Sequence, residues 1–164
     1  MESDVHICVV QSESGDKHYL TLLPPDLILS KGLLGEAVIG VLLRPLDPSE
    51  TITPEVFAPN GTFVAFMHEM IAKHTPDDPA CKAEAKRQGN GWIYVIDGRT
   101  KTPQGEVPPE DIIGAFKVAS GEIVPGGYQP NSRHLLLSSD GFFRLSPELY
   151  TQLVEELRAR TSAM

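Results

Sequence analysis

Two nine-residue segments share one pattern, Ile-x-Pro-x-x-aromatic-x-Pro-Asn, and this repetition constrains the fold more than any other feature. The pattern occupies residues 52–60 and again residues 123–131. Upstream of each copy lies an apolar run that contains an Ile-Gly pair, at 39–40 and at 113–114. The same ordered features in both halves predict a weak internal duplication.

A duplication predicts a shared backbone path as well as similar letters. Each segment should lead from a strand through a proline-rich loop to an Asn that begins the next element, and Asn60 and Asn131 are 71 residues apart. We therefore expect sub-repeats over 36–75 and 110–160 within one globular domain, 1–164. The two halves diverge after the Asn, where the first predicts a helix and the second a hairpin.

The other patterns predict an α+β fold, a mostly antiparallel sheet of hairpins with about two amphipathic helices packed on it and long proline-rich loops. Alternating or continuous apolar runs predict the strands, over residues 5–11, 18–23, 37–43, 92–96, 112–118, 122–124, 134–137 and 142–145. Residues 44–59 carry four prolines, which predicts a mostly extended loop.

Three helices have recognisable ends. Asn60 can cap a helix that runs to about His74, with apolar residues every three or four positions. A shorter, polar helix is predicted over 80–88, before Gly89. Ser146, followed by a proline in the first helical position, begins the C-terminal helix.

Composition limits the class of protein. The apolar fraction of 41% is that of an ordinary globular chain, and the net charge of −8 argues against binding to a nucleic-acid backbone. No apolar run reaches the ~20 residues that span a bilayer, and the acidic N-terminus does not resemble a signal peptide. Cys8 and Cys81 are isolated. These features predict a cytoplasmic protein with reduced thiols and no membrane association.

One candidate catalytic set lies around the strongest predicted strand, 92–96, because a buried strand holds a carboxylate rigidly at its exit. The acidic residues of this set, with Arg99 nearby, are Asp97, Glu106, Glu110 and Asp111. Paired carboxylates can share a proton or bind a hard cation. His134, with serines and Asp140 near it, is a further candidate, although no Gly-x-Ser-x-Gly motif is present. The structural interpretation is a turn aspartate beside a solvated acidic loop.

A second set of metal-ligand residue types follows in the first predicted helix and just beyond it, namely His68, Glu69, His74, Asp77, Asp78 and Cys81. Its two histidines are six residues apart, whereas a spacing of four places both on one helix face. We therefore predict no metal site and no cofactor.

The repeated segments offer candidate contacts to a ligand or partner. Phe57 and Tyr128 stand between prolines, which could present them as rigid aromatic contacts, with Asn60 and Asn131 beside them. The structural interpretation is that each aromatic residue fastens a loop to the core.

The sequence leaves the function open between classes. The main hypothesis is a small non-catalytic module that binds an unknown protein partner or forms a homo-oligomer. The alternatives are a metal-assisted hydrolase that uses Asp97 and neighbouring carboxylates, and a small-molecule-binding protein with a pocket near Tyr128. An enzyme requires the carboxylates to converge with a histidine in a concave pocket, whereas a binding module requires an exposed apolar surface.

Overall fold

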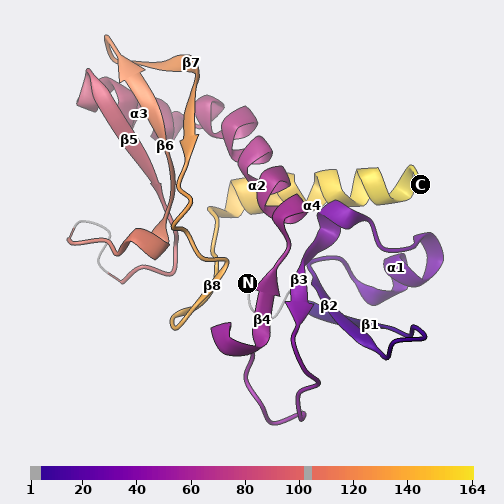
Figure 1. Ribbon diagram of the computed structural model, residues 1–164. Helices are drawn as coiled ribbons and strands as arrows, with labels where there is room; N and C mark the ends of the chain where they lie inside the picture. Colours follow the sequence, from indigo (N-terminus) through magenta and orange to yellow (C-terminus); the bar gives the residue numbers. More distant parts are fainter. Residues whose placement is uncertain (1–4, 102–104) are drawn as a thin grey trace.

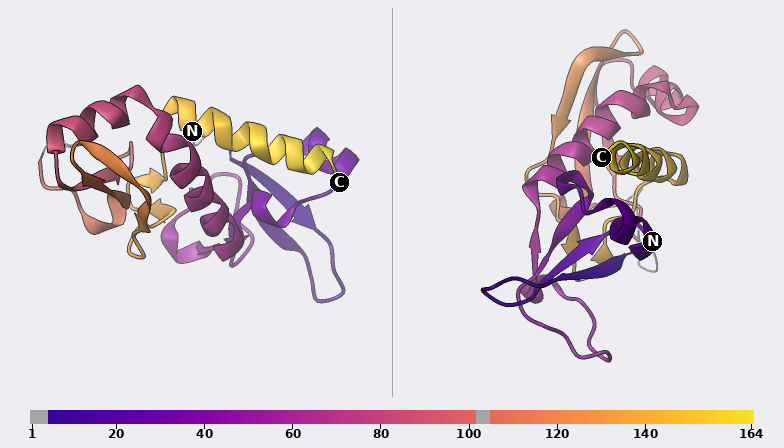
Figure 2. Two further views of the ribbon diagram at one scale, coloured as in Figure 1. Left: turned by 90° about the horizontal axis from the view of Figure 1, so that it is seen from above. Right: turned by 90° about the vertical axis from the view of Figure 1, so that its right-hand side faces the viewer.

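The computed structural model describes residues 5–101 and 105–164 and has an α+β fold with three antiparallel sheets and four α-helices. The two larger sheets lie at opposite ends of the molecule, and two long helices lie between them (Figures 1 and 2). Among the described residues, none of the helices has the length and apolar character that crossing a bilayer requires.

The first sheet has the order β1-β2-β3-β4, with all neighbours antiparallel. Its strands are β1 (His6–Val10), β2 (Lys17–Thr21), β3 (Val38–Leu42) and β4 (Phe57–Pro59). The predicted N-terminal hairpin is thus confirmed as β1 and β2.

The second sheet has the order β5-β6-β7, again antiparallel. Its strands are β5 (Gly91–Ile96), β6 (Ile112–Ala119) and β7 (Glu122–Pro130). A short hairpin of β8 (Leu137–Ser138) and β9 (Gly141–Phe142) forms the third sheet.

The helices are α1 (Pro25–Lys31), α2 (Gly61–His74), α3 (Pro79–Gln88) and α4 (Pro147–Ser162). The predicted caps are confirmed for α2 and α4, because the Asn60 side chain accepts from the Thr62 N–H and the Ser146 hydroxyl accepts from the Leu149 N–H. Short 3-10 helices precede strands or link helices, at η2 (Gly35–Ala37), η3 (Pro54–Val56), η4 (Thr75–Asp77) and η5 (Pro109–Asp111).

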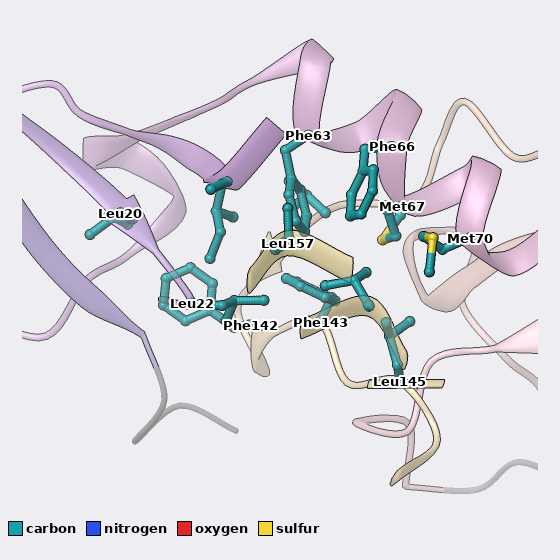
Figure 3. Packing of buried hydrophobic residues seen from close by; sticks show 14 of the residues in the cluster. Leu20, Leu22, Phe63, Phe66, Met67, Met70, Phe142, Phe143, Leu145 and Leu157 are labelled. Carbon is teal, nitrogen blue, oxygen red and sulfur yellow. The ribbon is translucent and has the colours of Figure 1, made fainter. Parts of the chain in front are cut away.

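One hydrophobic cluster joins the two ends of the molecule (Figure 3). The apolar stripe of α2 packs against α4 and the chain before it, through Phe63, Phe66, Met67, Met70, Phe143, Leu145 and Leu157. The ring centroids of Phe63 and Phe143 are 5.7 Å apart. The three- and four-residue spacing that predicted the stripe therefore serves the core.

Parts of the proline-rich segments, 57–59 and 125–130, are strands where the sequence predicted loops, and the strand predicted over 122–124 extends to Pro130. Phe57 belongs to β4 and Tyr128 to β7, and each strand ends in a proline. Both strands lie at an edge of their sheet, where a proline need not donate a hydrogen bond on its outer side. Proline content alone therefore underestimated these two strands.

The two sheets share a local geometry that the sequence repetition anticipated. In each, the central strand skips one residue against its first neighbour, leaving Ile39 and Ile113 unpaired. The carbonyl of each skipped residue accepts from the backbone N–H of Asn60 or Asn131. The equivalent pairs are Tyr19–Val41, Leu20–Gly40 and Thr21–Val38 in the first sheet, and Tyr94–Ala115, Val95–Gly114 and Ile96–Ile112 in the second.

The two asparagines make equivalent side-chain bonds. Each amide group donates to two carbonyl oxygens at matching positions, Asn60 to Gly35 (3.0 Å) and Val38 (2.8 Å), and Asn131 to Pro109 (2.8 Å) and Ile112 (2.7 Å). The matching geometry runs from β2 to Asn60 and from β5 to Asn131, a different span from the expected sub-repeats 36–75 and 110–160. Duplication of the gene segment itself stays a prediction.

Candidate functional site

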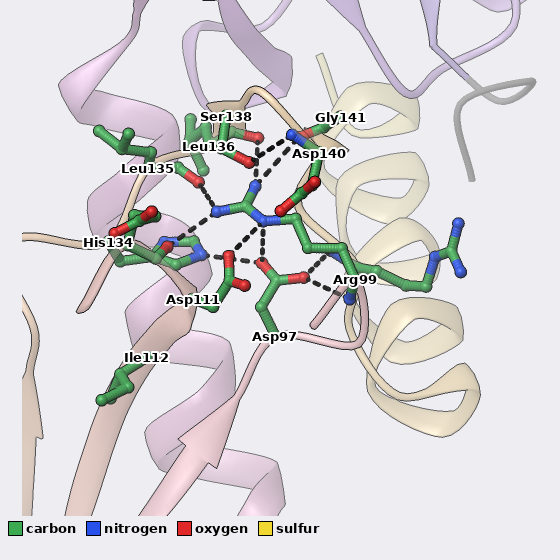
Figure 4. A network of polar contacts seen from close by, with 12 residues as sticks. Asp97, Arg99, Asp111, Ile112, His134, Leu135, Leu136, Ser138, Asp140 and Gly141 are labelled. Carbon is green, nitrogen blue, oxygen red and sulfur yellow. Dashed lines mark hydrogen bonds and ion pairs between the residues drawn. The ribbon is translucent and has the colours of Figure 1, made fainter. Parts of the chain in front are cut away.

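Three of the predicted catalytic residues meet behind the end of β5 (Figure 4). Asp97 follows β5 directly and is 0% exposed. Its Oδ2 lies 2.9 Å from Nε2 of His134, and because a carboxylate only accepts, Nε2 carries the proton. Its Oδ1 accepts from the backbone N–H of Arg99 (3.1 Å) and of Arg144 (2.9 Å).

Arg99 lies at the centre of this network. Its Nε donates to Oδ1 of Asp111 at 2.8 Å, and both side chains are 2% exposed. A guanidinium has five N–H groups, and the other four face carbonyl oxygens of Glu110 (2.8 Å), Leu135 (2.7 Å), Gly141 (3.1 Å) and Leu136 (3.5 Å). All five donors of Arg99 therefore have an acceptor within the protein.

This network favours a structural role for the acidic set. Glu110 contributes its backbone carbonyl and Glu106 lies exposed in the loop. The guanidinium of Arg99 occupies the place between Asp97 and Asp111 that a bound cation would need. The network ties the end of β5 to η5 and to the segment that carries β8 and β9, so its buried charges are paired and hydrogen-bonded as folding requires.

Tyr128 contacts a histidine that sequence reasoning did not connect with it. The Tyr128 hydroxyl lies 2.7 Å from Nδ1 of His68 on α2, and both side chains are half-buried. Burial lowers the pKa of His68 to about 4, with the nearby charge of His134 as a smaller cause. Burial also raises the pKa of the Tyr128 phenol. At neutral pH the hydroxyl is therefore hydrogen-bonded to a neutral imidazole.

The other predicted contact residues are occupied within the fold. Phe57 is buried and meets Phe142 edge-on, with ring centroids 5.8 Å apart. Asn60 and Asn131 bond the backbone, and Asn60 also lines a cleft of about 620 Å³ beside the first sheet. Tyr128 packs on Phe116, with ring centroids 4.8 Å apart.

The second predicted set does not converge on an ion. Glu69 lies near Arg160, and Asp78 accepts from the Ala80 N–H as the cap of α3. Across residues 5–101 and 105–164, no group of three or more His, Cys, Asp or Glu side chains is arranged to hold a metal ion.

A larger cleft of about 1160 Å³ lies between β5, α3, η4 and the first turns of α4. Its lining includes five consecutive residues of β5, from Trp92 to Ile96. Successive side chains of a strand point to opposite faces of its sheet, so a cleft that meets five in a row runs along the edge of the strand. β5 is the outer strand of its sheet.

The side chains of β5 differ on the two faces of the sheet. Ile93 and Val95 pack toward the core, while Trp92 and Tyr94 are 39% and 61% exposed. Large aromatic residues at a surface cleft are typical anchors for a partner. Phe116 and Leu149 supply buried apolar surface inside the cleft.

The charged residues that line the cleft are predominantly acidic. It holds four carboxylates, from Asp77, Asp78, Glu84 and Glu148, against one guanidinium, from Arg87. That guanidinium already donates to both oxygens of Glu84, at 3.0 and 2.8 Å. The cleft therefore carries a net negative charge that complements a basic ligand.

Sequence reasoning identified the strand at 92–96 but missed its cleft. The alternation of aromatic and β-branched residues over 92–95 could have indicated that one face of this strand is exposed. No local sequence pattern indicates that α3 lies beside the strand. Comparison with protein-family models, curated proteins and solved structures found no match for this chain.

Proposed function

We propose that this protein is a non-catalytic module that binds a segment of a partner protein in the cleft along β5. The observation that carries the proposal is the presence of Trp92 and Tyr94, both exposed, at a cleft of about 1160 Å³ beside an outer strand. Aromatic side chains supply large contact areas at a low entropic penalty, which is why they dominate protein interfaces.

The buried network supports binding over hydrolysis. A general base or metal ligand must reach the substrate, whereas Asp97 and Asp111 are 0% and 1% exposed and their oxygens face protein donors. The small-molecule hypothesis placed its pocket near Tyr128, and that residue lines neither of the two clefts described here.

A displayed library of linear peptides tests the proposal. Peptides selected on the protein should shift the backbone amide resonances of β5, α3 and the start of α4. They should also change the emission of Trp92, the single tryptophan of the chain. Ala80→Phe narrows the cleft and should weaken binding, because Ala80 lines it.

Ala83→Phe provides the matched control, since Ala83 is exposed on the same helix outside the cleft lining. The proposal is wrong if none of the selected peptides shifts the amide resonances of the residues that line the cleft. Equal loss of binding in both variants would overturn it as well.

A further inference from the structure

We infer that the partner segment binds as a fourth strand of the second sheet, antiparallel to β5, and that it alternates apolar and basic residues. This inference rests on the proposed function and specifies its ligand. It begins from the equivalence of the two sheets, in which β2, β3 and β4 correspond to β5, β6 and β7.

The first sheet has a strand that the second lacks. β1 pairs antiparallel with β2 on the side away from β3. Within residues 5–101 and 105–164, the corresponding side of β5 has no strand beside it, because β5 is the end of the order β5-β6-β7. β1 therefore shows, within the same molecule, how a strand fits on this edge.

The backbone of β5 is open to such a strand. In the described part of the chain, the backbone hydrogen bonds of residues 92–96 go to β6 alone. The outward N–H and C=O groups of an edge strand are a ready template for another chain. The cleft lies along this edge, and six residues of β5 offer about 20 Å of length.

The pairing of β1 predicts the register of the added strand. Cys8 lies opposite Tyr19, with Ile7 and Val9 opposite Leu20 and His18. The equivalent positions on β5 are Tyr94, Val95 and Ile93. Since paired residues share a face of the sheet, positions opposite Ile93 and Val95 point toward the core, and apolar side chains suit them.

The intervening positions lie on the face of Trp92 and Tyr94. A lysine or arginine there can lie over an exposed aromatic ring, and the net negative charge of the cleft favours a basic segment as a whole. A segment that alternates apolar and basic residues therefore places apolar side chains on the face of Ile93 and Val95 and basic side chains on the face of Trp92 and Tyr94. The same alternation is what an extended strand imposes on its side chains.

The backbone test uses peptides selected from the displayed library. Single N-methylation along a bound peptide should abolish binding at every second residue and leave it nearly unchanged at the residues between, since an antiparallel strand directs alternate N–H groups toward its neighbour. Amides of β5 should also exchange more slowly with solvent in the complex. Uniform tolerance of N-methylation, with binding still mapped to the cleft, would overturn strand addition while leaving the proposed function intact.

The charge test compares two substitutions on α4. Glu148→Lys removes a carboxylate of the cleft, and Glu155→Lys makes the same charge change at an exposed position outside it. Selected peptides should bind Glu148→Lys roughly fivefold more weakly or worse, a difference of about 1 kcal/mol, and Glu155→Lys nearly as well as wild type. Equal affinities would overturn the basic character of the ligand. If the protein sediments as a dimer and its two copies pair β5 with β5, the occupant of the edge is a second copy of this chain, and the inference of a separate partner is wrong.

Discussion

The Nε of Arg99 lies 2.8 Å from Oδ1 of Asp111 in a site where both side chains are 2% exposed. Such a pair contributes little beyond what well-packed apolar residues would, yet removal of one member leaves a buried charge without compensation. Replacing either residue alone should therefore destabilise the protein strongly.

Arg99→Ala should lower the free energy of unfolding by about 3–5 kcal/mol, because Asp111 and four carbonyl oxygens lose their donor. Urea denaturation followed by circular dichroism measures the change. Arg44→Ala is the control, since its ion pair with Glu50 is exposed (53% and 33%) and should contribute far less. Similar losses in the two variants would show that the buried network does not organise the fold.

Gly114→Ala should cost about 1–3 kcal/mol, because an added Cβ would overlap the ring of Tyr128. Gly40→Ala should cost a similar amount, since Phe57 covers that glycine in the same way. Thermal unfolding measures both. Gly61→Ala is the control, as nothing lies within 4 Å of its added Cβ in the first turn of α2. A tolerated Gly114→Ala would contradict the close packing of the ring.

Asn131→Asp should destabilise the protein about as much as Asn131→Ala, by about 1–3 kcal/mol. Both variants remove the two N–H donors that face the Pro109 and Ile112 carbonyls, although the aspartate keeps an acceptor for the Arg133 N–H. Asn60→Asp should lower the free energy of unfolding by a similar amount, because Asn60 makes the equivalent bonds in the first sheet. An aspartate variant as stable as wild type at either position would show that the donors are dispensable.

The sequence predicted those parts of the fold that have local causes. Asn60 and Ser146 cap helices because their side chains reach N–H groups two and three residues away. The repeated Asn also predicted a shared position, which the matching carbonyl contacts of Asn60 and Asn131 display. Strand β4 was missed and β7 was predicted only over 122–124, because their prolines lie at sheet edges, and edge position is a property of the whole sheet.

The candidate site was predictable only in part, for the same reason. Asp97, Asp111 and His134 were identified by residue type, and the structure brings all three together. Their role depends on Arg99, whose Nε donates to Asp111 and whose other four N–H groups face backbone carbonyls, three of them 36–42 residues along the chain. The cleft beside β5 likewise depends on how α3 and α4 are placed, which no local pattern encodes.

Protonation of His68 should destabilise the protein. Its folded pKa of about 4 lies below the ordinary histidine value of 6.5, so between these values the unfolded chain binds more protons than the native one. Stability is then full above pH 6.5, falls as the pH drops below it, and levels off below about pH 4. In the protonated ring Nδ1 carries a hydrogen and can only donate, so the Tyr128 hydroxyl must accept from it.

Urea denaturation between pH 4 and pH 7 measures this dependence. His68→Asn has an amide in place of the imidazole and cannot titrate, so its free energy of unfolding should fall less over this interval than that of wild type. His18→Asn makes the same substitution on β2 and serves as the matched comparison. Parallel curves for wild type and His68→Asn would mean that the proton reaches His68 as readily in the native protein as in the unfolded chain. Burial would then not hold the imidazole neutral.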